Sequence, residues 1–480
     1  MHFRPVFFAL GILLIILSIM MIPPTLIDLI DKNLDWRAFA GAQIFTAFIG
    51  LLLTFSTHQK DLTIRMREAF ILTNLSWLVI AAFGALPLLF ADLNLSFTDA
   101  FFESMSGITT TGSTILTGLD DMPRGILLWR SILEWLGGIG ILVMALAVLP
   151  LLHVGGMQLF KTESMDVEKV LPSAAQIAAS IGLIYLMLTA ICAAAYSIAG
   201  MSRFDALNHA MTTIATGGFS THDESVGYFD SALIDYLGTF FMLLSSLPFV
   251  LYLRALRGNI GALFQDRQVI WFLSILGTAI LAIAAHLVIT GDKSIADAIR
   301  YASFNTVSVM TGTGYATTDY SVWGVFCVGL FFFLMCVGGC AGSTTCGIKI
   351  FRFQVLYEVS KVQITKLVKP HASIRPHYNG QPVSADVQMS VMAFFFLFAL
   401  SFSFIVIALS FTGLDYLTAM SGAVTAISNV GPGLGNIIGP AGTFGGLPDS
   451  AKWILSSGML LGRLELFTFL VMLSPHFWRR

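Results

Sequence analysis

The chain has 480 residues, of which 56% are hydrophobic and 11% are charged, and its formal net charge is −2. Soluble globular proteins carry about 25% charged residues, so this composition excludes an ordinary soluble domain. The sequence has no basic tail or acidic block, and we therefore expect no nucleic-acid partner. It predicts an all-α membrane protein surrounded by a lipid bilayer.

Ten apolar stretches are long enough to cross a bilayer core as helices, which takes about 20 residues. The first begins just after Arg4 and ends at Pro23 and Pro24, and we interpret it as a retained helix, with a signal peptide as the alternative. The expected spans are residues 6–24, 39–57, 69–90, 125–150, 177–199, 232–253, 269–290, 322–350, 388–411 and 452–474.

The distribution of Lys and Arg predicts the orientation, because cytoplasmic loops are enriched in these residues. With the N-terminus inside and one crossing per stretch, 17 of the 26 Lys and Arg residues lie inside and 8 outside, while Arg463 lies within the last span. We therefore expect a multi-pass protein with both termini in the cytoplasm.

Four of the outside loops share a pattern that begins a helix. In each, Ser or Thr is followed by Asp three residues later, which is typical of a capping box. A short helix of about 10 to 14 residues is expected after each box, too short to cross a bilayer. The four boxes are Ser96 with Asp99, Ser202 with Asp205, Ser294 with Asp297, and Thr412 with Asp415.

A glycine turn follows each short helix, at Gly112, Gly218, Gly314 and Gly431. Ordinary extracellular turns are the alternative, but four equivalent positions favour a repeat of span, re-entrant helix, glycine turn and span. Irregular backbone at membrane depth is tolerated where it is buried or lines a water-filled cavity. The expected architecture is two N-terminal transmembrane helices plus four span–pore-helix–span repeats around a pseudo-fourfold central pore. The units are 1–60, 61–160, 161–258, 259–370 and 371–480.

The chemistry of the four turns favours a monovalent cation. Helix C-termini carry partial negative charge, so four of them pointing at one axis attract cations. Rings of backbone carbonyls replace the hydration shell of potassium in channel filters. The turns contain no carboxylate side chains, which argues against a calcium filter.

On these motifs the whole chain resembles the membrane subunits of the Trk/Ktr/HKT superfamily, especially the bacterial TrkH group. The resemblance implies a potassium-selective channel or transporter subunit for low-affinity uptake in a bacterial inner membrane, with K+ as the transported ion and no organic cofactor. It also implies a homodimer and a cytosolic nucleotide-binding ring similar to TrkA. The selectivity filter that it implies comprises Thr110, Thr111, Gly112, Gly217, Gly218, Thr313, Gly314, Val430 and Gly431. The fourth turn, with Pro432, departs from the Thr-Gly pattern of the others.

Residues 337–347 interrupt the span 322–350 with small and polar side chains. Such a stretch does not remain helical cheaply. Close helix packing through small residues is one interpretation, and an unwound loop below the filter is the other. The resemblance implies an intramembrane gate made of Gly338, Gly339, Gly342, Ser343, Thr344, Thr345 and Arg463.

Arg463 lies about a dozen residues into the last span, where an Arg costs about 2.5 to 3.5 kcal/mol on insertion scales. Either it forms a structural ion pair, or, as the resemblance implies, it faces the cavity and repels cations near the gate. Glu465 is expected to point elsewhere on the helix. Arg130 and Glu134 are spaced i,i+4, which predicts a local, structural pair.

The cysteines and the remaining histidines predict no catalytic or metal site. Cys336, Cys340 and Cys346 are expected to fill space, and neither a disulfide nor a metal site is expected. His153, His209, His222 and His286 are scattered in the sequence and predict no site.

Two other functions are alternatives to a potassium channel. A cation-coupled secondary transporter with broken helices is the alternative. An intramembrane enzyme is disfavoured, since no nucleophile–base or metal constellation is visible. The inside segments 152–176 and 356–387 are polar and long enough to dock a soluble partner.

Overall fold

The computed structural model describes residues 3–58, 65–144 and 174–479. The described chain is helical apart from connecting loops and a two-stranded hairpin, in which β1 (His377–Tyr378) pairs antiparallel with β2 (Gln381–Pro382). The segment 152–176, which we expect to dock a partner, lies almost wholly outside these ranges, as does His153.

The N-terminal region is a helical hairpin. Helix α1 (Arg4–Met20) continues into α2 (Ile22–Ile30), and α3 (Trp36–Thr57) packs back along it. Helices α1 and α3 touch at Gly11, where an added Cβ would lie 2.8 Å from the carbonyl oxygen of Gly50. Helix α1 ends at Met20, just before Pro23 and Pro24. The prolines do not end the helical course as expected, because both lie in the first turn of α2, where a missing N–H costs little.

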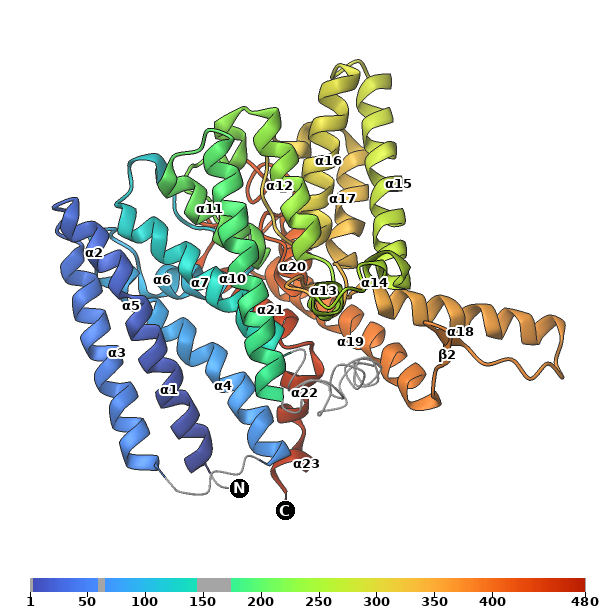
Figure 1. The fold of residues 1–480 in the computed structure, drawn as a ribbon, viewed down its shortest axis with the longest axis horizontal. Coiled ribbons are helices and arrows are strands. Elements are labelled where there is room, and N and C mark those ends of the chain that lie inside the picture. Colours follow the sequence, from blue (N-terminus) through green and yellow to red (C-terminus); the bar gives the residue numbers. More distant parts are fainter. Residues whose placement is uncertain (1–2, 59–64, 145–173, 480) are drawn as a thin grey trace.

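Four units of span, short helix and span follow (Figure 1). The first has α4 (Met66–Gly84) with α5 (Leu86–Phe90), then α6 (Phe97–Ile108) and α7 (Arg124–Val143). The second has α10 (Ala174–Ile198), α11 (Arg203–Ala215), and α12 (Ala232–Ser245) with α13 (Phe249–Leu256).

The third and fourth units follow the short α14 (Gly261–Gln265). The third has α15 (Arg267–Ile289), α16 (Ile295–Thr311), α17 (Val325–Val337) and α18 (Ile350–Val368), which projects away from the other helices in Figure 1. The fourth has α19 (Ala385–Ser410), α20 (Tyr416–Ser428), α21 (Asp449–Arg463), α22 (Phe467–Leu473) and α23 (Pro475–Trp478). Three 3-10 turns, Leu119–Asp121, Ser225–Phe229 and Tyr320–Val322, lie in the loops that lead to the second spans.

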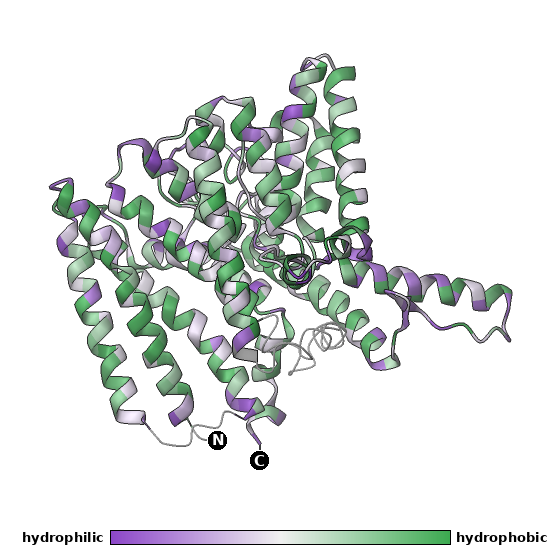
Figure 2. Ribbon diagram, in the orientation of Figure 1, coloured by the Kyte–Doolittle hydropathy of each residue, from purple (hydrophilic) through white to green (hydrophobic). Residues whose placement is uncertain are grey.

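The helices long and apolar enough to cross a membrane agree with the ten expected spans. Seven described helices pass on length and composition, and two bent pairs add one span each. The remaining span is α17, a shorter apolar helix that ends where the sequence predicts the break at residue 337. Hydrophobic residues run along the long helices, and hydrophilic ones gather at their ends and along α18 (Figure 2). Large exposed apolar side chains such as Ile44, Phe55 and Phe404 mark a surface covered by lipid.

Two of the second spans are sharply bent. Helices α12 and α13 meet at 91°, and α21 and α22 meet at 112°. The first bend falls just before Pro248, which cannot donate a helical hydrogen bond. The second contains Glu465 and Leu466, both with positive φ. Neither bend is predicted by the sequence, which indicates straight spans at both places.

Three of the four predicted capping boxes begin the short helices. The Ser96, Ser202 and Ser294 hydroxyls accept hydrogen bonds from the backbone N–H three residues later, at 3.1, 3.1 and 3.2 Å. The fourth prediction is wrong by three residues. Helix α20 is capped by Asp415, whose carboxylate accepts from Thr418 N, so Thr412 lies outside the helix.

Candidate functional site

Four glycine turns lie immediately beyond the C-termini of the four short helices, α6, α11, α16 and α20. Gly112, Gly218, Gly314 and Gly431 have φ angles of +80°, +88°, +82° and +108°. Residues with a side chain rarely adopt positive φ, whereas glycine adopts it readily. The sequence prediction that these four glycines are equivalent is therefore matched by their backbone conformation.

The four turns close into a ring in which each glycine touches the next repeat. A Cβ added to Gly112 would lie 2.0 Å from the carbonyl oxygen of Gly217. One on Gly218 would lie 1.8 Å from Thr313 O, and one on Gly314 would lie 2.1 Å from Val430 O. The fourth contact returns to the first repeat, because a Cβ added to Gly431 would lie 2.8 Å from Thr111 O. Each carbonyl belongs to the residue before a ring glycine, so the arrangement has fourfold pseudosymmetry.

Side-chain hydrogen bonds join the first and fourth segments of this glycine ring. Ser113 Oγ donates to Gly431 O at 2.7 Å, and Asn429 Nδ2 donates to Thr111 Oγ1 at 2.9 Å. The fourth turn thus takes part fully, although its sequence departs from the other three. All nine residues of the predicted filter lie in the four ring segments, and Thr110, Thr111, Thr313 and Val430 are buried there.

A cavity of about 250 Å³ opens above the ring, lined by three ring glycines, Pro432 and loop residues of several repeats. The short helices end at the ring, so the partly negative ends of their dipoles meet there. The ring itself offers backbone carbonyls and threonine hydroxyls without a carboxylate. This combination is suited to a weakly hydrated monovalent cation.

A non-helical segment between α17 and α18, residues 338–349, crosses beneath the ring; we call it the crossing loop. Its Gly338, Gly342, Gly347 and Lys349 all have positive φ. Thr216, two residues before Gly218, donates through Oγ1 to Thr344 Oγ1 at 3.2 Å. The loop therefore touches the inner end of the ring.

The crossing loop is tied to the bend between α12 and α13. Cys340 N donates to Ser246 O at 3.1 Å, and Phe249 N donates to Gly342 O at 2.9 Å. Ala341 N donates to Gln268 Oε1 at 3.0 Å. The predicted gate residues Gly338, Gly339, Gly342, Ser343, Thr344 and Thr345 all lie in this loop.

Arg463, at the end of α21, reaches the same loop while being only 1% exposed. Its guanidinium donates to Thr344 O at 3.3 Å, to Cys346 Sγ, and to Gly137 O of α7 at 2.9 Å. These hydrogen-bond acceptors are carbonyls and a thiol, so the ion-pair interpretation is not supported. Cys346 does more than fill space, because its sulfur accepts from Arg463.

Glu465 points elsewhere, as expected, and holds the far end of the crossing loop. Its carboxylate lies 3.1 Å from Lys349 Nζ and also pairs with Arg352 at the start of α18. All three side chains are at most 5% exposed. This buried group fixes α18 to the bend after α21.

The predicted local pair of Arg130 and Glu134 is wrong. Arg130 Nε instead donates to Glu103 on α6 at 2.8 Å, and its Nη1 donates to Ser220 O at 2.9 Å. Glu134 accepts from Phe219 N at 3.1 Å. Both side chains thus hold the backbone just after Gly218, at Phe219 and Ser220. The i,i+4 spacing gave the wrong partner because Glu103 lies closer to Arg130 in space.

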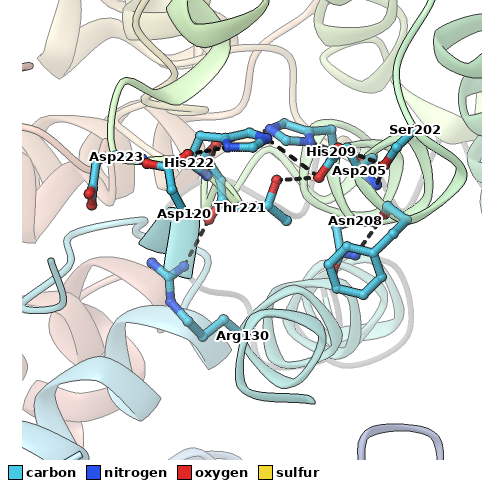
Figure 3. A network of polar contacts seen from close by, with 11 residues as sticks. Asp120, Arg130, Ser202, Asp205, Asn208, His209, Thr221, His222 and Asp223 are labelled. Carbon is cyan, nitrogen blue, oxygen red and sulfur yellow. Dashed lines mark hydrogen bonds and ion pairs between the residues drawn. The ribbon is translucent and has the colours of Figure 1, made fainter. Parts of the chain in front are cut away.

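The prediction of scattered histidines is also wrong for His209 and His222, whose ring centroids lie 6.5 Å apart. His222 Nδ1 lies 2.5 Å from Asp120 Oδ1, and its Nε2 lies 3.5 Å from Asp205 Oδ1 (Figure 3). This outer cluster joins the outside loops of the first two repeats. No group of three His, Cys, Asp or Glu side chains in the described chain could hold a metal ion.

The outer cluster is expected to be more stable at low pH. Burial disfavours protonation of His222, but hydrogen bonds to Asp205 and Asp120 outweigh it and raise the pKa of His222 above 6.5. A raised pKa gives stability that is complete below pH 6.5 and is lost as the pH rises through the raised value. The difference in unfolding free energy between wild type and His222→Gln should therefore be larger at pH 6 than at pH 9, by on the order of 1 kcal/mol. Thermal unfolding at the two pH values measures it. An equal difference at both pH values would contradict this.

The fold and the ring together define an all-α membrane protein with four span–pore-helix–span repeats around a pseudo-fourfold central pore. A family model described as TrkH, cation transport protein, matches residues 36–480. The chain therefore belongs to the TrkH family of cation transport proteins. This is a family of transporters rather than enzymes.

Curated relatives and a solved structure cover the chain completely. It is 46% identical over 481 residues to the Trk system potassium uptake protein TrkI of Halomonas elongata, covering 100% of this chain and 98% of the relative. It is 39% identical over 487 residues to TrkH of Escherichia coli, with both covered at 100%. The crystal structure of the potassium transporter TrkH from Vibrio parahaemolyticus matches with a TM-score of 0.93 at 38% identity and 100% coverage of both chains.

Proposed function

We propose that this protein is a potassium-selective permeation subunit whose filter is the glycine ring and whose gate is the crossing loop with Arg463. The observation that carries the proposal is the closed set of contacts between each ring glycine and a carbonyl of the next repeat. Such a ring presents carbonyl oxygens from four segments, which is the chemistry that replaces potassium's hydration shell. The potassium uptake of its named relatives supports the choice of ion.

Within this proposal the filter is formed by Thr110, Thr111, Gly112, Gly217, Gly218, Thr313, Gly314, Val430 and Gly431. The burial of Thr110, Thr111, Thr313 and Val430 and the hydrogen bonds across repeats to Gly431 O and Thr111 Oγ1 support the assignment. The crossing loop serves as the gate because it lies at the inner end of the ring, where Thr344 contacts Thr216. Positive φ at several of its positions keeps it non-helical.

The test is cation flux into proteoliposomes that contain the purified protein. We expect potassium to pass and sodium to be excluded, without a proton or sodium gradient. Sodium flux equal to potassium flux would refute the selectivity. Potassium flux that depends strictly on such a gradient would favour coupled transport instead.

We further propose a bacterial inner-membrane protein that works as a homodimer, has cytoplasmic termini and binds a cytosolic nucleotide-binding ring. The basic α18 and the hairpin after it support a docking role, since they project from the helical body (Figure 1). Copurification with a TrkA-like subunit, with and without nucleotide, tests the partner. Light scattering of the detergent-solubilised protein tests the dimer.

A further inference from the structure

Side chains behind the glycine ring occupy one equivalent position in three repeats. Counting back nine residues from each ring glycine gives Glu103, His209, Asn305 and Gly422. The first three are at most 1% exposed and lie on the short helices α6, α11 and α16. Each makes a hydrogen bond to a residue two or three positions after the ring glycine of its own repeat. We call each of these hydrogen-bonded links a tie.

In the first repeat the tie is a carboxylate. Glu103 Oε1 accepts from Thr114 Oγ1 at 2.8 Å, and Oε2 accepts from Ile115 N at 2.9 Å. Arg130 neutralises this buried charge through Nε, and its Nη2 donates to Thr114 Oγ1 at 3.1 Å. A charged hydrogen bond of this kind is stronger than a neutral one.

In the second repeat the tie is a histidine. His209 Nδ1 lies 2.9 Å from the carbonyl oxygen of Asp205, which can only accept, so Nδ1 carries the proton. Neutral Nε2 is then an acceptor for Ser220 Oγ at 3.0 Å. Figure 3 shows His209 within the outer cluster, beside His222 and Asp205.

In the third repeat the tie is an amide. Asn305 Nδ2 donates to Thr317 Oγ1 at 2.8 Å, and its Oδ1 accepts from Thr317 N at 3.2 Å. The fourth repeat has Gly422 at this position and therefore no side chain to make a tie. Its neighbour Ser421 donates instead to Leu434 O, at the longer distance of 3.3 Å.

We propose that Glu103, His209 and Asn305 are positioning residues that hold the outer ends of three filter segments and thereby set the discrimination between potassium and sodium. They do not reach the ring carbonyls; each fixes the chain that follows a ring glycine. Discrimination by a carbonyl ring depends on how firmly its oxygens are held at the spacing of one ion. The inference rests on the proposed filter.

Asn305 offers the cleanest test, because the chain contains a matched control. Asn305→Leu removes both bonds to Thr317 at nearly constant volume. Asn208→Leu makes the same change at a buried Asn on α11 whose Nδ2 donates within its own helix, to Phe204 O. We expect the ratio of potassium to sodium flux to fall about threefold or more in Asn305→Leu and to stay at the wild-type value in Asn208→Leu.

The partner side chain gives a second route that does not depend on a buried substitution. Thr317→Val removes the hydroxyl and should lower the flux ratio, while Thr317→Ser keeps it and should preserve the ratio. Combining Asn305→Leu with Thr317→Val should lower the ratio no further than Asn305→Leu alone. If Asn305→Leu does not fold, the two Thr317 variants decide.

The outcomes separate this inference from the proposed function. A selective wild type whose flux ratio is unchanged by Asn305→Leu or Thr317→Val would overturn the positioning role alone. An equal fall of the ratio in Asn208→Leu would overturn it too, by showing a general packing effect. A wild type that passes sodium and potassium alike would instead overturn the proposed function, and this inference with it.

Discussion

Replacing Gly218 by alanine is expected to abolish potassium flux while the protein still folds. The new Cβ would lie 1.8 Å from the carbonyl oxygen of Thr313, far inside van der Waals contact. The oxygen must move away from the position at which it meets an ion, and a ring of carbonyls tolerates such a shift poorly. Flux into proteoliposomes should fall to about 1% of wild type or less, as expected for a misplaced ligand set.

A matched glycine separates this clash from ordinary backbone strain. Gly413 has a φ of +87°, close to the +88° of Gly218, but a Cβ there would meet nothing within 4 Å. Gly413→Ala therefore bears the same strain of about 1 to 2 kcal/mol without touching the ring. Its flux should stay near wild type, and a loss as large as that of Gly218→Ala would contradict the clash.

The ring contacts also predict an order among the four glycines. A Cβ added at Gly112 or Gly218 would lie 2.0 Å or less from the neighbouring carbonyl oxygen, and one at Gly314 2.1 Å, but one at Gly431 would lie 2.8 Å away. Alanine at Gly431 should leave more flux than alanine at any of the other three. The same difference fits the departure of the fourth turn from the Thr-Gly pattern.

The sequence predicted the architecture because its signals are local and repeat four times. Span length depends on composition alone, and each glycine turn follows a capped short helix. The break after Val337 was also visible, since a run of small and polar residues interrupts an apolar span. The fourth cap was misplaced by three residues because both Thr412 and Asp415 are good caps.

What the sequence could not predict depends on residues distant in the chain. Arg130 lies four residues from Glu134 but bonds to Glu103 in another helix. Glu465 pairs with Lys349 and Arg352, more than 100 residues earlier, and no local pattern indicates such a pair. The positions nine before each glycine were missed because Glu, His, Asn and Gly share no chemistry by which to align them. Only Pro248 offered a local signal for the bend after α12.

Replacing Arg463 by alanine is expected to raise potassium flux in the absence of any stimulating partner, by on the order of tenfold. The guanidinium joins the crossing loop to α7 through Thr344 O and Gly137 O. Two hydrogen bonds from a charged donor contribute about 1.5 to 3 kcal/mol each, so their loss frees the loop beneath the ring. Alanine also carries no positive charge, so cations beneath the ring are no longer repelled.

Arg463→Lys distinguishes the two effects, because Lys keeps the charge but lacks the planar fork that reaches several acceptors. If hydrogen bonding holds the loop, unstimulated flux in Arg463→Lys should lie nearer to that of Arg463→Ala. If repulsion dominates, it should stay nearer to wild type. Cys346→Ala, which removes only the sulfur acceptor, should change flux less than either. Flux in Arg463→Ala at or below the wild-type level would remove Arg463 from the gate.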